Sequence, residues 1–163
     1  MSWILSVSLC SGDEKLLPNE IRWIRESKEY ESLCRQIYTH AQEKIDGIAK
    51  DSESNLAVVI DLDETVLDNS QYQVERSRSG LRFTQESWSK WVQRREAGLV
   101  PGAKGFLKRA RELGLKIVFL SNRMHSNLNP TKENLKALGV LDPSDIFLLR
   151  RNKADTKEIR RNE

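Results

Sequence analysis

The sequence lacks the features typical of disulfide-rich, membrane-spanning and nucleic-acid-binding proteins. Only two of its 163 residues are cysteines, too few for a disulfide framework, and neither stands at metal-ligand spacing from a histidine. It has no apolar run near the roughly 20 residues that span a bilayer. The net charge of +3 is small and bases alternate with acids, which argues against a nucleic-acid-binding surface.

The N-terminus gives no convincing signal for export. Cys10 suggests a lipid-attachment site, but the preceding residues lack a basic leader, form only a short apolar run and place the bulky Leu9 beside the cysteine. We expect residues 1–17 to be flexible. Residues 18–163 have a length that suits one domain with a single core, and the sequence has no repeats or low-complexity tracts.

Two patterns divide this domain. From 18 to 51, apolar residues recur at intervals of three and four, which predicts an N-terminal helical segment whose apolar face packs on the rest of the domain. That face comprises Trp23, Tyr30, Leu33, Cys34, Ile37, Ala41, Ile45 and Ile48. From 56 to 163, apolar strands alternate with helices, which predicts an α/β core with a parallel sheet flanked by helices.

Local signals place the elements of this core. Short apolar runs at 57–60, 115–120 and 146–149 predict strands. Thr84 predicts the N-cap of a helix that contains Trp88 and Trp91. Pro101-Gly102 opens a further helix that ends before Gly114, and Pro130 starts one that ends before Gly139.

The end of the first predicted strand carries the strongest functional signal. Residues 57–60 are apolar and mostly β-branched, which favours a central strand buried on both faces, and Asp61 and Asp63 follow at once. Ligands of open α/β sheets bind beyond the carboxyl ends of the strands. The two carboxylates lie on the same side of the chain, so they repel unless a cation such as Mg²⁺, a shared proton or solvent relieves them. The alternative is a simple acidic turn.

A second strand end supports a catalytic interpretation and a resemblance. Residues 115–120 are followed by Ser121-Asn122-Arg123. Together with Asp61-Leu62-Asp63-Glu64-Thr65-Val66-Leu67-Asp68-Asn69-Ser70 and Pro101-Gly102-Ala103, this resembles the haloacid dehalogenase (HAD) superfamily of phosphohydrolases. Within it, the chain looks most similar to the class C acid phosphatases, the lipoprotein 5′-nucleotidase family. The resemblance runs from about Ile21 to Arg161, and it implies a Rossmann-like HAD sheet and an extracytoplasmic or outer-membrane location.

The resemblance assigns roles to the two acids. Asp61 would attack phosphorus to form an aspartyl-phosphate, and Asp63 would act as the general acid and then the general base. A magnesium ion would take the side chain of Asp61 and the backbone carbonyl of Asp63. Thr65 would orient the turn and Asp63 among the phosphate-binding residues, or alternatively only cap a local turn.

The other phosphate-binding residues follow in the same way. Ser121 would donate its hydroxyl to a phosphoryl oxygen and Asn122 its amide, unless this pair merely opens a loop. Lys157 matches the lysine of the family best, because paired arginines follow it, with Lys153 as the competitor.

The stretch 69–100 follows the catalytic turn, where HAD enzymes insert a small substrate-binding segment. Tyr72 and Trp91 are candidates for stacking on a nucleotide base, whereas Trp88 is better explained by helix packing.

The chain departs from the family at its end. A class C phosphatase continues into a strand that ends in Gly-Asp-Asn-x-x-Asp, and the acids of that motif complete the magnesium site. This sequence ends at Glu163, and Asp142 and Asp145 stand before Lys157, in the wrong place. The core therefore reads as incomplete. Two hypotheses follow: a Mg²⁺-dependent hydrolase of small phosphomonoesters, including nucleotides, and a catalytically incompetent HAD-like domain. The oligomeric state is left open.

Overall fold

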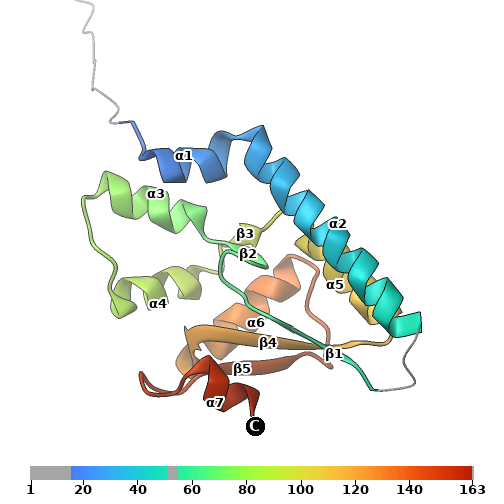
Figure 1. Cartoon of the computed structure of the whole chain (residues 1–163). Coiled ribbons are helices and arrows are strands. Elements are labelled where there is room, and N and C mark those ends of the chain that lie inside the picture. Colours follow the sequence, from blue (N-terminus) through green and yellow to red (C-terminus); the bar gives the residue numbers. More distant parts are fainter. Residues whose placement is uncertain (1–15, 51–54, 163) are drawn as a thin grey trace, which may run out of the picture.

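The computed structural model describes residues 16–50 and 55–162, so Cys10 and almost all of the segment predicted to be flexible lie outside the described residues. The chain forms short strands and helices in alternation (Figure 1). In order they are α1 (Asn19–Glu26), α2 (Lys28–Lys50), β1 (Ala57–Ile60), β2 (Leu67–Asp68), α3 (Ser70–Arg78), α4 (Gln85–Arg94), β3 (Gly98–Leu99), α5 (Ala103–Glu112), β4 (Lys116–Met124), the 3₁₀ helix η1 (His125–Asn127), α6 (Leu128–Ala137), β5 (Ile146–Arg150) and α7 (Lys157–Arg161).

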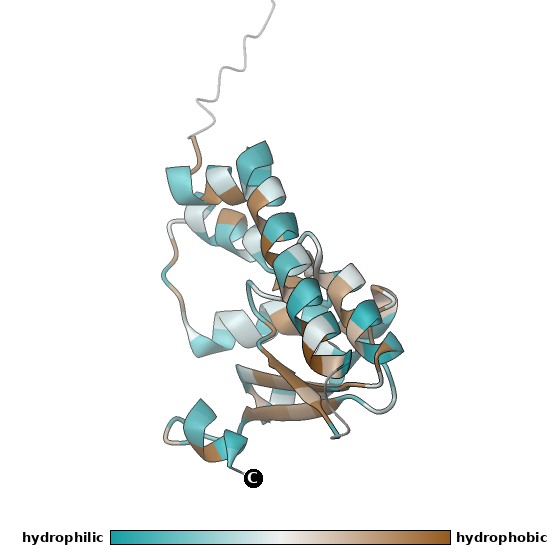
Figure 2. Cartoon of the chain, turned by 45° about the vertical axis from the view of Figure 1, so that its right-hand side comes forward, coloured by the Kyte–Doolittle hydropathy of each residue, from teal (hydrophilic) through white to brown (hydrophobic). Residues whose placement is uncertain are grey.

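The main sheet is parallel, as the sequence predicts, with strand order β1-β4-β5. Its strands are the most hydrophobic part of the ribbon in Figure 2, while the helices turn hydrophilic faces outward. The prediction that β1 is a central strand buried on both faces is wrong. Among the described strands β1 pairs only with β4, and Val59 is 51% exposed. Strand order depends on how distant segments cross over, which an apolar run does not encode.

The predicted N-terminal helix is two helices that meet at Ser27. The backbone of Ser27 is extended, and its hydroxyl accepts a hydrogen bond from the backbone N–H of Tyr30, so Ser27 caps the start of α2. Only part of the predicted apolar face packs on the core. Tyr38 is buried, with Cys34, Ala41 and Ile45 against the core, whereas Trp23, Leu33, Ile37 and Ile48 are exposed.

The contact between α2 and α5 depends on one glycine. Gly102 precedes α5 with φ of +94°, and a Cβ at this position would lie 2.9 Å from the Cβ of Tyr38. The ring of Tyr38 then packs on Phe106 of α5, with ring centroids 5.5 Å apart. A side chain at position 102 would therefore separate the two helices.

The predicted helix starts are mostly correct. Thr84 caps α4: its hydroxyl accepts from the backbone N–H of Ser87 at 3.0 Å, and Ser87 completes the capping box. Helix α6, however, begins at Leu128 instead of Pro130. The proline lies within its first turn, where a missing N–H breaks no intrahelical bond. Among the described helices, none is long and apolar enough to cross a membrane.

The segment after the first predicted strand folds as a small insertion. It contains α3 and α4, which lie beyond the carboxyl ends of the main strands in Figure 1. The antiparallel pair β2–β3 closes its base, with Leu67 opposite Leu99 and Asp68 opposite Gly98. The insertion is therefore held next to the strand ends at which ligands of such sheets bind.

Candidate active site

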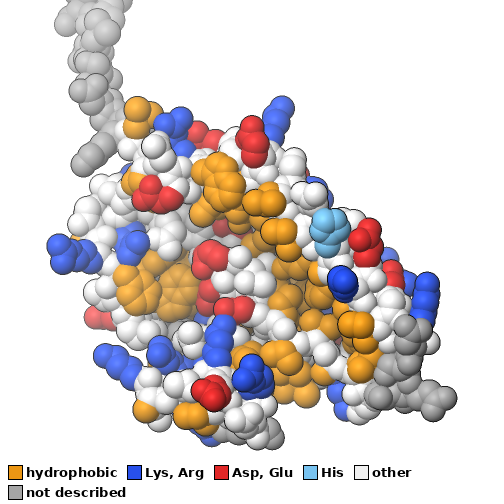
Figure 3. All heavy atoms as spheres, viewed as in Figure 1, with side chains coloured by type: hydrophobic (Ala, Val, Ile, Leu, Met, Phe, Trp, Pro, Cys, Tyr) orange, Lys and Arg blue, Asp and Glu red, His pale blue; other side chains and the backbone are white. Residues whose placement is uncertain are grey.

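The residues after β1 form a tight, buried turn. The carbonyl of Leu62 accepts hydrogen bonds from the backbone N–H groups of Val66 and Leu67, at 2.9 and 2.8 Å. Leu62, Val66 and Leu67 are completely buried, and Glu64 has the uncommon φ of +55°. This packing fixes the turn and leaves its polar residues at the surface, where acidic side chains gather near the middle of the face in Figure 3.

Asp61 meets a lysine from the C-terminal helix. Lys157 Nζ lies 2.5 Å from Asp61 Oδ2, and both side chains are about one third exposed. Asp61 Oδ1 accepts from the backbone N–H of Leu62 at 2.8 Å. Lys153, the alternative in the sequence, is exposed. The structure thus brings the predicted nucleophile and the predicted lysine together at the strand end.

A buried arginine holds α7 in this position. Arg160 is 1% exposed and donates to the carbonyl of Ser121 at 2.6 Å and to that of Leu148 at 3.3 Å. Its second terminal nitrogen donates to Asn122 Oδ1 at 2.9 Å. Because the amide oxygen of Asn122 is engaged, its NH₂ group is the end left to donate. Sequence reasoning gave Arg160 no role of its own, and the pair of arginines after Lys157 was the one signal for it.

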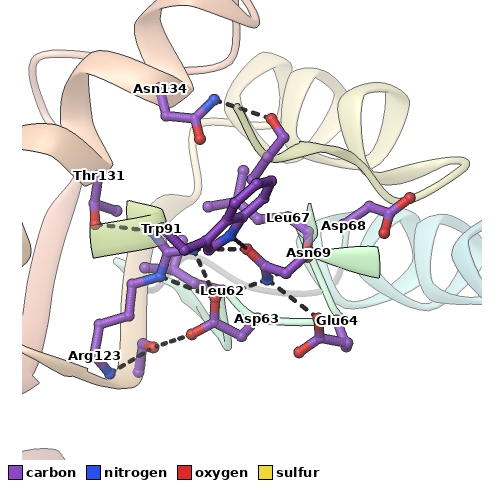
Figure 4. Close-up of polar contacts among 12 residues, drawn as sticks. Leu62, Asp63, Glu64, Leu67, Asp68, Asn69, Trp91, Arg123, Thr131 and Asn134 are labelled. Carbon is purple, nitrogen blue, oxygen red and sulfur yellow. Dashed lines mark hydrogen bonds and ion pairs between the residues drawn. The ribbon is translucent and has the colours of Figure 1, made fainter. Parts of the chain in front are cut away.

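Asp63 is bound by a second buried arginine. Arg123 is 1% exposed, and its Nε and Nη2 donate to Asp63 Oδ1 at 2.9 and 2.7 Å. Asn69 Nδ2 donates to the same oxygen at 3.0 Å. The other oxygen, Oδ2, lies 3.4 Å from the hydroxyl of Ser121. Figure 4 shows these groups converging on Asp63 from β4 and from the turn before α3.

The two aromatic residues proposed to stack on substrate lie inside the insertion. Trp91 is 2% exposed and donates its indole N–H to Asn69 Oδ1 at 2.9 Å. Tyr72 is 5% exposed, and its hydroxyl pairs with Ser87 Oγ. Arg94 lies over the Trp91 ring. Both rings are almost completely buried, although they line a cavity together with Leu81, Ser87 and Arg94. Their burial argues against the predicted stacking on a substrate and favours packing roles, and Trp91 orients Asn69.

Two residues predicted to bind phosphate, Thr65 and Ser121, have other contacts in the structure. Thr65 does not orient Asp63 through its side chain, because the side-chain partners of Asp63 among the described residues are Asn69, Ser121 and Arg123. The turn uses the backbone carbonyl of Thr65 instead, which accepts from the hydroxyl of Tyr38 at 2.5 Å. Ser121 is completely buried, with its hydroxyl toward Asp63. Asn122, in contrast, is exposed.

Burial and hydrogen bonding shift two titratable groups that support the site. Burial raises the pKa of Tyr38 from 10.0 to about 12. The pKa of Asp155, in the loop before α7, lies below its ordinary value because the backbone N–H and guanidinium of Arg151 bind the carboxylate, with Arg160 adding favourable charge.

The described residues do not form a complete site for a metal ion. They contain no group of three or more histidine, cysteine, aspartate or glutamate side chains that could hold one. Asp145, one of the two acids that stand before Lys157 in the sequence, is buried against Arg111, with 2.8 Å between Arg111 Nη2 and Asp145 Oδ2.

A parallel α/β sheet with two acids beyond one strand, a polar motif near the end of the next and a lysine returning to the first acid defines a HAD-like phosphohydrolase site. A sequence model of the HAD superfamily, subfamily IIIB (acid phosphatase), matches residues 14–163. The chain belongs to this family.

Solved structures agree with the family assignment. The class C acid phosphatase from Bacillus anthracis with tungstate bound superposes with a TM-score of 0.79 and 35% identity, over 87% of this chain and 60% of that chain. A second structure of the enzyme gives a TM-score of 0.77 and 33% identity with the same coverage. The stem 31 kDa glycoprotein of Glycine max is 31% identical over 81 residues, 50% of this chain and 32% of that protein. The chain therefore spans 60% of the solved chains and about a third of this relative.

Proposed function

We propose that the chain hydrolyses small phosphate monoesters with Asp61 as the nucleophile. The observation that carries this proposal is the contact between Lys157 and Asp61, residues 96 positions apart whose charged atoms lie 2.5 Å apart at the end of β1. Phosphoryl transfer is catalysed mainly by positioning and by neutralising charge, so a cation beside an attacking carboxylate fits this reaction.

The reaction has two steps. An oxygen of Asp61 forms a bond to phosphorus as the ester P–O bond breaks, and Asp63 gives a proton to the departing alcohol oxygen. Water then attacks the aspartyl-phosphate, Asp63 takes its proton, and phosphate leaves as the carboxylate of Asp61 is restored. Lys157, which contacts Asp61, and the NH₂ group of Asn122 would contact phosphoryl oxygens in this reaction.

The family resemblance makes Mg²⁺ the expected cofactor, with the side chain of Asp61 and the backbone carbonyl of Asp63 as ligands. Magnesium demands near-octahedral oxygen coordination. Both oxygens of Asp61 already accept hydrogen bonds, and the described residues offer no third acid in a cluster. These residues alone do not fit the ion, and we expect them to bind Mg²⁺ weakly.

For a nucleotide substrate, Phe83 of the insertion is a candidate for stacking on the base, because its ring is exposed whereas Tyr72 and Trp91 are buried. Phe83 is 54% exposed and its ring centroid lies 6.3 Å from that of Trp88. Trp88 in turn lies 5.6 Å from the guanidinium of Arg123, which binds Asp63. This series of contacts connects the exposed ring to Asp63 and supports Phe83 as the residue that would stack on a base attached to the phosphate.

The second candidate function is a phosphate-binding domain without turnover. The lack of a three-acid cluster among the described residues favours it. The two functions separate when oxyanion binding and hydrolysis are measured on the same protein.

The experiment measures tungstate binding by calorimetry, because a solved relative binds that oxyanion, and hydrolysis of p-nitrophenyl phosphate with and without Mg²⁺. We expect Lys157→Met to weaken tungstate binding about 10- to 100-fold, the loss of a charge-assisted hydrogen bond, and Asp61→Asn to abolish hydrolysis. Lys153→Met is the matched control and should change neither. Binding without turnover under any metal supports the second candidate. Turnover retained by Asp61→Asn refutes the assigned nucleophile.

A further inference from the structure

The two oxygens of Asp63 are treated very differently by their neighbours. Three nitrogen donors reach Oδ1: Nε and Nη2 of Arg123 and Nδ2 of Asn69, at 2.7 to 3.0 Å. Oδ2 faces one hydroxyl, that of Ser121, at the long distance of 3.4 Å. An oxygen that accepts three N–H bonds has no lone pair left for a proton, so Oδ2 is the oxygen free to exchange one.

Arg123 is itself fixed on every side. Its Nη1 donates to Thr131 Oγ1 of α6 at 3.0 Å, its Nη2 also reaches Asn69 Oδ1 at 3.3 Å, and its guanidinium packs near the ring of Trp88. Thr131 is completely buried. A guanidinium held by three other elements presents its donors to Asp63 in one orientation.

Asn69 completes the arrangement. Its Oδ1 accepts from Trp91 of α4 and from Arg123, which leaves its NH₂ group to donate to Asp63 (Figure 4). The insertion and the sheet thus meet at one carboxylate. An acid that only needed solvent access would not require three buried partners, Arg123, Asn69 and Ser121, to set its direction.

We propose that Arg123 is the positioning residue for proton transfer: it fixes Asp63 so that Oδ2 delivers the proton to the leaving group. This inference rests on the proposed hydrolysis. Arg123 binds Asp63 and acts through that carboxylate. Its loss should therefore affect the step in which the leaving group takes a proton, and spare oxyanion binding at Lys157.

The test compares two substrates. The p-nitrophenolate of p-nitrophenyl phosphate leaves without needing a proton, whereas the alkoxide of glycerol 2-phosphate requires one. For Arg123→Lys we expect kcat/KM on glycerol 2-phosphate to fall on the order of 10²- to 10⁴-fold, the range for a lost general acid. On p-nitrophenyl phosphate kcat/KM should fall less than about tenfold, because this ratio reports the departure of the leaving group and not the later hydrolysis of the aspartyl-phosphate, in which Asp63 acts for both substrates.

Thr131→Val provides a variant that keeps the arginine and the shape of the core. It removes the acceptor of Arg123 Nη1, and we expect a smaller loss with the same bias toward glycerol 2-phosphate. Thr39→Val is its control, because the hydroxyl of Thr39 binds a carbonyl on the exposed surface of α2. Equal losses on both substrates would overturn the proposal.

A spectroscopic measurement separates this inference from the proposed function. The indole N–H of Trp91, assigned with Trp91→Phe, reports on Asn69 through its hydrogen bond. We expect its NMR shift and exchange rate to change in Arg123→Lys and Thr131→Val but not in Thr39→Val. An unchanged indole signal overturns the positioning role. A wild-type chain with no turnover on either substrate refutes the proposed function, while the indole signal still decides whether Arg123 orders the Asn69–Asp63 pair.

Discussion

Replacing Gly102 by alanine should be one of the most damaging small substitutions in the chain. A Cβ at this position would lie 2.9 Å from two atoms of Tyr38, closer than real Cβ atoms approach, and the residue has φ of +94°. The left-handed backbone costs an L-residue about 1–2 kcal/mol, and overpacking a core costs about 1–3 kcal/mol. Reduced entropy of the unfolded chain returns only about 0.4–1 kcal/mol. We therefore expect a net loss of about 2–4 kcal/mol in the free energy of unfolding.

Two other glycines separate the cost of the left-handed backbone from the cost of the close contact with Tyr38. Gly114 has φ of +77° but open space where its Cβ would stand, so Gly114→Ala should show only the backbone cost, about 1 kcal/mol. Gly47 lies inside α2 with nothing near, and Gly47→Ala should stabilise the helix by up to about 1 kcal/mol.

Urea unfolding followed by circular dichroism measures all three variants under one set of conditions. If Gly102→Ala costs no more than Gly114→Ala, the close approach of Tyr38 is not what requires glycine, and the reasoning fails. The effect should also reach the candidate site, because the hydroxyl of Tyr38 donates to the carbonyl of Thr65 in the turn after β1.

Three further outcomes are expected. Tyr38→Phe leaves the carbonyl of Thr65 unpaired and should lower the free energy of unfolding by about 1–3 kcal/mol. Because the pKa of Tyr38 in the folded protein, about 12, lies above the ordinary 10.0, the unfolded wild type loses this proton at lower pH than the folded protein does. The urea midpoint of the wild type should therefore fall more steeply between pH 10 and 12 than that of the variant. Asp155→Asn should make stability depend less on pH in acid. A carboxylate with a lowered pKa stabilises the fold at pH values above its ordinary pKa and stops doing so as the pH falls through the lowered pKa. Melting temperatures that fall equally from pH 5 to 3 in variant and wild type would contradict this. Thr84→Ala removes the N-cap of α4 and should cost about 0.5–2 kcal/mol, whereas Thr39→Ala on the exposed face of α2 should cost clearly less.

The parts of the site that sequence predicted are those fixed by short-range pattern. Asp61 and Asp63 follow an apolar run, and Ser121 follows another, so a parallel pairing of the two strands must bring them to one edge. The family pattern selected Lys157 over Lys153, and the geometry places Lys157 at Asp61. In each case the decisive information lies within a few residues of the motif.

The parts that sequence missed depend on partners far along the chain. A basic residue in a charged segment predicts solvated surface, yet Arg123 and Arg160 are both 1% exposed. An arginine is buried only when acceptors surround it, and these acceptors come from the turn after β1, from α6 and from the ends of β4 and β5. The same holds for Trp91, whose aromatic ring suggested stacking but whose indole N–H is used to orient Asn69.

The irregular end of β4 explains how one strand serves both halves of the site. Pairing with β5 shifts between Ser121 and Met124, so Asn122 and Arg123 have no direct partner in the sheet. Bulges of this kind redirect side chains and commonly stand next to active sites. Here the irregularity turns Arg123 inward to Asp63 and offers the carbonyl of Ser121 to Arg160, whose helix carries Lys157 to Asp61. Asp63 and Asp61, the proposed acid and the proposed nucleophile, are thus positioned from opposite sides of the same short segment. This is also why Ser121-Asn122-Arg123 reads as a loop in the sequence although it continues the strand.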